Sequence, residues 1–223
     1  MMLYALFGFL FGFAVPYMAR RFGKFMPATF AYALIQLLKP EKLIINKRTL
    51  PKLKAYFWRS FMYGLVTAAL SYMVVWRFGE GLVWGPLLFV WILVLLSEID
   101  YRIYLLPDIL TVPLLLLGFA FVAFGGGWIG VSQSASGALA GYFLPVLASL
   151  FIVWKHRDAF GGGDIKLLAG IGSWLGVDGV LWVILLSCLL FCVYALIFGR
   201  RQGAFGPAIS ISAIIIAFWF FGV

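Results

Sequence analysis

The sequence predicts an all-α, polytopic membrane protein with about eight transmembrane helices and one short cytoplasmic amphipathic segment. Of its 223 residues, 65% are hydrophobic and 11% are charged, and the mean hydropathy is +1.07. Such a chain has too few polar residues to cover a folded core in water, which excludes a water-soluble protein. Apolar stretches of about 17 to 25 residues, long enough to cross a bilayer core of roughly 30 Å as helices, recur along nearly the whole sequence.

Seven of these stretches predict membrane-spanning helices directly. They run from Met2 to Met18, Phe57 to Trp76, Leu82 to Leu96, Leu110 to Phe124, Ala135 to Trp154, Val180 to Phe198 and Phe205 to Phe221. An eighth, Ile165 to Leu175, is short and contains glycine, so it predicts a crossing helix, a tilted helix or a re-entrant segment shielded by protein. The first stretch lacks the basic start and small-residue cleavage pattern of a signal peptide, so we expect it to remain in the mature protein.

The basic residues predict the orientation of these spans. Most of the 17 Lys and Arg lie in or beside the first loop, Ala19 to Tyr56, which the positive-inside rule places in the cytoplasm. Alternate threading of eight spans puts Glu98 to Asp108, Lys155 to Lys166, and Arg200 with Arg201 on the same side. We therefore divide the chain into residues 1–56, a membrane helix plus a basic cytoplasmic loop, and residues 57–223, a membrane-embedded core.

The formal net charge of +9 does not indicate nucleic-acid binding. The basic residues gather in loops beside membrane spans, where attraction to anionic lipid accounts for them. The mixture of Leu, Ile and Lys in the first loop suggests a short amphipathic helix on the membrane surface. We therefore expect the basic residues to contact membrane lipids and not nucleic acid.

Two aspartates are the leading candidates for function in a chain with 8 acidic residues. Asp100 and Asp164 each lie at the edge of a long apolar segment, where an ionisable group is costly and indicates a functional site by default. Asp164 closes the run Gly161-Gly162-Gly163-Asp164, whose glycines permit backbone shapes and close approaches that other residues do not. Pro107 limits how far a helix from Asp100 can continue. The predicted topology places both aspartates at the cytoplasmic face.

Two carboxylates at one site can share a proton, and an acid and a base acting on one water can hydrolyse a peptide without a covalent intermediate. A structural interpretation is equally compatible with the spacing. In it, Asp164 caps its helix and Asp100 pairs with Arg102 or Arg157, while Asp108 caps the next span.

The remaining candidate residues predict no other chemistry. Cys188 and Cys192 are four apart on one apolar helix, with no second pair and no nearby His, so we interpret them as packing residues and predict no metal site. His156 lies in a basic run typical of a solvated loop. No Ser, His and Asp set for nucleophilic catalysis and no phosphate-binding loop is present.

The settings of both aspartates resemble those of a known family. The stretch from Asp100 to Leu117, with Pro107 in Leu-Leu-Pro-Asp-Ile-Leu-Thr, resembles the first active-site region of the bacterial type IV prepilin peptidases. The stretch Phe160 to Leu168 resembles their second, a GxGD motif followed by an aliphatic helix with a Lys. Phe205-Gly206-Pro207 fits the family's C-terminal pattern.

This resemblance implies an aspartic protease of the bacterial inner membrane that removes the basic leader from prepilins or pseudopilins of type IV pilus and type II secretion systems. It implies that Asp100 and Asp164 carry out hydrolysis at the cytoplasmic face and that no cofactor is needed for it. Gly161 and Gly163 would let the substrate strand approach, and Lys166 would act on Asp164 or bind a polar group.

The sequence departs from the family in its first loop. Many members carry two CxxC pairs there and also methylate the new N-terminus of the pilin with S-adenosylmethionine, but this loop contains no Cys. The sequence therefore contains the peptidase motifs but does not decide whether the protein also transfers a methyl group. The alternatives are another GxGD protease that cuts within a membrane helix, whose first motif is typically Tyr-Asp where this chain has Ile99-Asp100, and a proton-coupled transporter.

Overall fold

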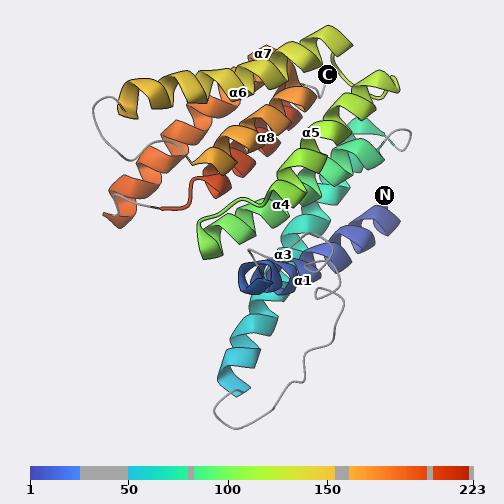
Figure 1. The fold of residues 1–223 in the computed structure, drawn as a ribbon. Helices are drawn as coiled ribbons and strands as arrows, with labels where there is room; N and C mark the ends of the chain where they lie inside the picture. The colour runs from blue at the N-terminus through green and yellow to red at the C-terminus, as the bar shows by residue number, and fades with distance from the viewer. Residues whose placement is uncertain (26–49, 80–82, 154–160, 200–202, 221–223) are drawn as a thin grey trace.

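The computed structural model describes residues 1–25, 50–79, 83–153, 161–199 and 203–220, which form helices and no strand. The helices are α1 (Met2–Phe25), α3 (Leu50–Phe78), α4 (Trp84–Ile103), α5 (Asp108–Ala123), α6 (Val131–Val153), α7 (Gly162–Phe198) and α8 (Gly206–Phe220) (Figure 1). The prediction of an all-α chain is confirmed over these residues. The predicted amphipathic segment of the first loop falls mainly in residues 26–49, outside the described part of the chain.

Three of the helices are long and apolar enough to cross a membrane: Met2–Phe22, Leu53–Phe78 and Gly162–Phe198. Two shorter apolar helices, Asp108–Ala123 and Gly206–Trp219, complement them. Apolar side chains such as Trp76 and Leu196 are widely exposed on the helix surfaces, as expected for a protein whose solvent is lipid. An integral membrane protein is therefore supported, and the number of eight crossings stays a prediction.

The short stretch Ile165 to Leu175 belongs to α7 but is separated from the rest of it by Gly176. This residue has φ 71° and ψ −173°, a backbone conformation that only glycine adopts readily. It divides α7 into a first limb, residues 162–175, and a second limb, residues 177–198. Every residue from Leu167 to Gly176 is buried. The first limb covers about 20 Å at 1.5 Å per residue, less than a bilayer core, and neighbouring helices shield it from lipid.

Glycines allow α6 to pack closely against the first limb of α7. A Cβ atom on Gly137 would lie 2.3 Å from the carbonyl oxygen of Gly172, and one on Gly172 would lie 2.1 Å from that of Gly137. The hydroxyl of Ser134 also donates a hydrogen bond to the carbonyl of Ser173 at 2.6 Å. Small residues and interhelical hydrogen bonds are the usual means of helix association in membranes. Burial of apolar surface contributes little to that association, because lipid is itself apolar.

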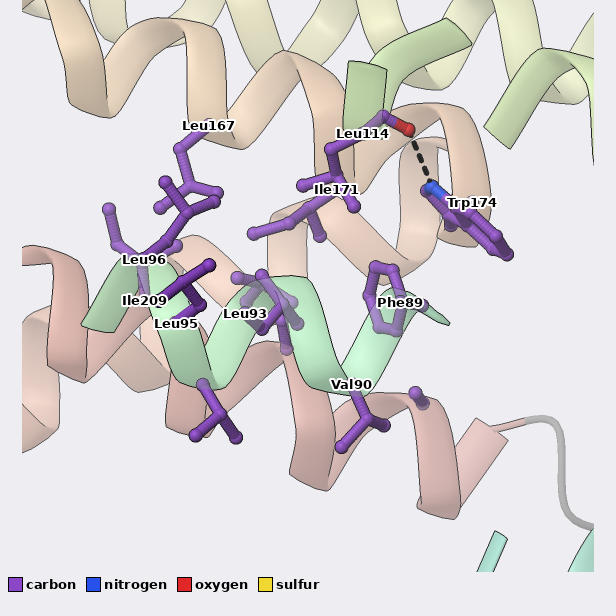
Figure 2. Close-up of a cluster of buried hydrophobic side chains, with 14 of the residues drawn as sticks. Phe89, Val90, Leu93, Leu95, Leu96, Leu114, Leu167, Ile171, Trp174 and Ile209 are labelled. Carbon is purple, nitrogen blue, oxygen red and sulfur yellow. Dashed lines mark hydrogen bonds between the residues drawn. The ribbon is translucent and has the colours of Figure 1, made fainter. Parts of the chain in front are cut away.

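A buried apolar cluster joins the first limb of α7 to α4 and α5 (Figure 2). Trp174 is 1% exposed, and its indole Nε1 donates a hydrogen bond to the carbonyl of Leu114 on α5 at 2.9 Å. Its ring lies 5.1 Å from that of Phe89 on α4, between centroids. The first limb is thereby held against both helices at its far end, away from Asp164.

The helix α4 lies at the centre of the arrangement. It packs against α1 and α3 on one side and against α5 and α8 on the other, so it links the two halves of the fold (Figure 1). Most of its residues are buried, including the acidic Glu98 and Asp100 in its last two turns. Two ionisable side chains near the end of α4 therefore lie in the interior of the protein.

We expect Gly137→Ala to lower the free energy of unfolding by about 1–3 kcal/mol, because the added methyl group must push α6 away from α7. The measurement is thermal or denaturant unfolding of the purified protein in detergent. Gly162→Ala is the matched control, since a Cβ there has no neighbour within 4 Å. Equal stability of the two variants would contradict the close α6–α7 contact.

Candidate active site

Asp100 lies in the last turn of α4 and is 5% exposed. The helix ends at Ile103 because Tyr104 adopts a left-handed conformation, with φ 53°, and donates its N–H to the carbonyl of Asp100 at 2.8 Å. Pro107 then holds an extended backbone, with φ −74° and ψ 133°, immediately before α5. The sharp connection between α4 and α5 follows from these two residues, and it keeps Asp100 at a helix end.

The carboxylate of Asp100 is bonded to the start of α8. Its Oδ2 accepts the N–H of Gly206 at 2.7 Å. A Cβ on Gly206 would lie 2.7 Å from the same oxygen and 2.9 Å from the Cβ and Cγ of Asp100, so only glycine fits at this position. The positive end of the α8 dipole adds to the stabilisation of a negative charge there. The sequence motif Phe205-Gly206-Pro207 was noted, but its contact with Asp100 was not predicted.

Asp164 lies in the first turn of α7, which begins after Gly161 in an extended conformation. Its N–H donates to the carbonyl of Gly161 at 3.0 Å. A Cβ on Gly163 would lie 2.8 Å from the Cβ of Leu106, so this glycine lets the start of α7 approach the α4–α5 connection. The glycine run thus brings Asp164 toward Asp100. Gly163 serves a contact within the chain, whereas Gly162 has no neighbour within 4 Å.

Both aspartates line one open cavity of about 950 Å³. The cavity wall contains all the residues predicted to catalyse the reaction or shape the site, together with apolar residues of α1 and α5. The predicted residues are Asp100, Pro107, Gly161, Gly163, Asp164 and Lys166. Residues far apart in the sequence therefore meet at one water-accessible site.

Lys166 is bonded to Asp108 at the edge of this cavity. Its Nζ lies 2.7 Å from each carboxylate oxygen of Asp108, and both side chains are well exposed. The pair connects the first turn of α5 to the first turn of α7. Asp108 is the first residue of α5, and Pro107 is its N-cap. The interpretation of Asp108 as a helix cap is therefore wrong.

Glu98 is a buried charged residue that the sequence reasoning did not single out. It is 0% exposed and accepts hydrogen bonds from Arg59 Nη2 at 2.8 Å, Tyr63 Oη at 2.5 Å and Arg102 Nε at 2.5 Å. Arg102 is thus paired with Glu98, which corrects the alternative that it pairs with Asp100. Arg157, the other partner considered, lies outside the described residues. The spacing of Glu98 and Arg102, four apart on a helix, was the available signal.

The sequence comparisons agree with this geometry. Residues 87–196, which include both aspartates, match the type IV leader peptidase family. The chain belongs to this family.

Relatives of this chain include proteins named prepilin leader peptidase/N-methyltransferase. One from Neisseria gonorrhoeae is 34% identical over 157 residues, which cover 68% of this chain and 54% of the relative. One from Aeromonas hydrophila is 39% identical over 168 residues, covering 70% and 56%. One from Xanthomonas campestris is 36% identical over 171 residues, covering 70% and 57%. The chain thus spans just over half the length of these relatives. No solved structure matches it.

We expect Glu98→Leu to lower the free energy of unfolding by about 1.5–3 kcal/mol, because Arg59 and Arg102 lose the carboxylate that accepts their charge-assisted hydrogen bonds. Asp108→Asn breaks a well-exposed ion pair and should cost less than about 1 kcal/mol. Unfolding of both variants in the same detergent measures the difference. If Glu98→Leu were as stable as Asp108→Asn, the cluster around Glu98 would not anchor α4.

Proposed function

We propose that this chain is an aspartic endopeptidase that removes the basic leader from type IV prepilins or pseudopilins. Its active site would lie at the cytoplasmic face of the bacterial inner membrane and would serve pilus assembly or type II secretion. The observation that carries the proposal is the position of Asp100 and Asp164 at two helix ends on the wall of one open cavity.

The two carboxylates suit hydrolysis by an acid–base pair. The ionised one takes a proton from water, and the hydroxide so formed attacks the carbonyl carbon of the scissile peptide. The protonated one donates a hydrogen bond to the carbonyl oxygen and stabilises the developing negative charge. The C–N bond breaks as the leaving nitrogen accepts a proton from the pair. Two interacting carboxyl groups hold one proton between them easily, because ionising both at close range is costly.

The neighbours of each aspartate support this division of labour without fixing it. Asp100 has the N–H of Gly206 as a donor, and Gly161 and Gly162 are exposed beside Asp164. An open cavity at helix ends gives water and an extended peptide access to both groups. Pro107 shapes the cavity wall by ending the connection between α4 and α5, and Gly163 does so by letting the start of α7 approach that connection. The ion pair of Lys166 and Asp108 forms the charged edge of the cavity.

The alternative functions fit these features less well. A proton-coupled transporter would be expected to place its carboxylates near the middle of the bilayer, between repeated bundles. Asp100 and Asp164 instead lie in the last turn and the first turn of their helices. Another GxGD protease that cuts within a membrane helix shares the dyad, so a prepilin substrate is the discriminating test.

Methyltransfer with S-adenosylmethionine is a separate prediction. The relatives carry N-methyltransferase in their names, but the chain spans just over half of them. Its two cysteines, Cys188 and Cys192, lie in α7, and the sequence of the first loop contains none. We assign no residue to this second reaction.

We expect Asp100→Asn and Asp164→Asn each to reduce cleavage of a purified prepilin by at least about 10³-fold, because either change removes one partner of the acid–base pair. Leader release is followed by mass spectrometry of both products, with a pseudopilin tested in parallel. Unchanged thermal unfolding shows that each variant is folded.

Full activity in either Asn variant would refute the dyad. Asp178→Asn is the matched control, since Asp178 is an exposed aspartate on α7 away from the cavity. The same mass measurement, made with S-adenosylmethionine present, tests methyltransfer. An unmethylated product would make this chain a peptidase alone.

The cytoplasmic location predicts a pattern of thiol labelling. In a background with Cys188 and Cys192 replaced by Ala, Gly162→Cys should react in intact cells only with a membrane-permeant reagent. Ser132→Cys, at the start of α6 on the predicted outer side, should also react with an impermeant reagent. Both positions are exposed. Labelling of Gly162→Cys by the impermeant reagent would contradict the predicted orientation of the protein in the membrane.

A further inference from the structure

The helix α5 presents an exposed apolar face that begins at the cavity. Val112 and Leu116 are 44% and 59% exposed, and Pro113 is exposed beside them. Ile109 precedes them by one turn, so the four side chains follow the spacing of one helical face. We call Ile109, Val112, Pro113 and Leu116 the outer face of α5. Three of these four, all except Leu116, also line the cavity that contains the aspartates.

Tyr104 and Leu105 are also exposed at the cavity, but they lie in the short connection between α4 and α5. The other described helices at the cavity present no comparable apolar face there. The end of α4 is buried from Leu93 to Leu96 and again from Glu98 to Asp100, and the first limb of α7 is buried from Leu167 onward. Phe22 of α1 lines the cavity but is 6% exposed. Among the described helices that line the cavity, α5 is thus the one whose exposed apolar residues both line it and continue away from it.

We propose that the apolar helix of the substrate docks on the outer face of α5, with its polar end entering the cavity between Asp100 and Asp164. This inference rests on the proposed function, because a leader peptidase must cut where a polar leader meets an apolar helix. A bond at that junction can reach the aspartates only if the apolar segment beside it leaves the cavity through the membrane. The outer face of α5 starts at the cavity and runs away from it.

The dimensions and chemistry of α5 suit this partner. From Asp108 to Ala123 the helix is about 24 Å long at 1.5 Å per residue, which is most of the roughly 30 Å that a membrane-spanning segment covers. Its first turn carries Asp108, which is paired with Lys166 of α7. The polar end of the substrate would therefore meet charged side chains, and its apolar end would meet apolar side chains. Association would come from packing, since lipid is as apolar as either helix.

A photo-crosslinking residue at Leu116 tests the docking site. The control is the same residue at Leu185, which lies on the second limb of α7 with a similar exposure of 62% and does not line the cavity. Both are placed in the Asp164→Asn chain, so that a full-length prepilin is bound and not cut. We expect an adduct with the apolar segment of the prepilin from position 116 and several-fold less from position 185.

Kinetics provide a second readout with an active enzyme. We expect Leu116→Trp to raise the KM for prepilin about threefold or more with kcat unchanged, because the added bulk hinders docking and not chemistry. Leu185→Trp should leave both constants unchanged. A peptide with the leader and cleavage site but no apolar segment should be cut equally by both variants.

The outcomes separate the two proposals. If the unmodified chain cuts prepilin but adducts form equally from 116 and 185, or position 116 links to a second copy of the enzyme, docking on α5 is overturned and the peptidase stands. An unchanged KM for Leu116→Trp would have the same meaning. If the unmodified chain cuts no prepilin or pseudopilin, the proposed function itself fails, and docking fails with it.

Discussion

The carboxylate of Asp100 is the point at which the two halves of the fold meet. It belongs to α4, the central helix, and it accepts the first N–H of α8 through Gly206. A buried carboxyl oxygen needs such a donor, because burying a polar group without a hydrogen bond is costly. The start of α8 needs an acceptor for the same reason, since its first N–H groups have no partner within the helix. One contact meets both requirements, and it fixes α8 relative to the site.

Glu98 holds the opposite side of α4 in a similar way. Two residues apart on a helix, Glu98 and Asp100 point in nearly opposite directions. Glu98 is bonded to Arg59 and Tyr63 on α3, while Asp100 is bonded to α8. The rotation of α4 about its axis is therefore set by polar contacts on two sides. Apolar packing alone would permit small rotations, because lipid and Leu are energetically similar neighbours.

Local features of the sequence were enough to predict the helical class and the position of both aspartates at helix ends. Apolar length revealed the helices, and the glycine run and Pro107 marked the ends where charges lie. The partners of those charges could not be predicted, because Arg59 reaches Glu98, Lys166 reaches Asp108 and Gly206 reaches Asp100 across large sequence separations. The division between the predicted stretches Ile165–Leu175 and Val180–Phe198 agrees with the break at Gly176. Its backbone conformation could not be predicted, since a glycine between two apolar stretches does not reveal whether its backbone is helical.

The left-handed Gly176 has a consequence for motion within the protein. It leaves the first limb of α7 enclosed by other helices, with Trp174 bonded to Leu114 at its far end. Enclosed segments open last in local unfolding, so the amide hydrogens of residues 167–175 should be among the slowest to exchange with solvent. Asp164 would then lie at the start of one of the most rigid parts of the chain. Any movement that admits a peptide would occur in the more exposed helix α5.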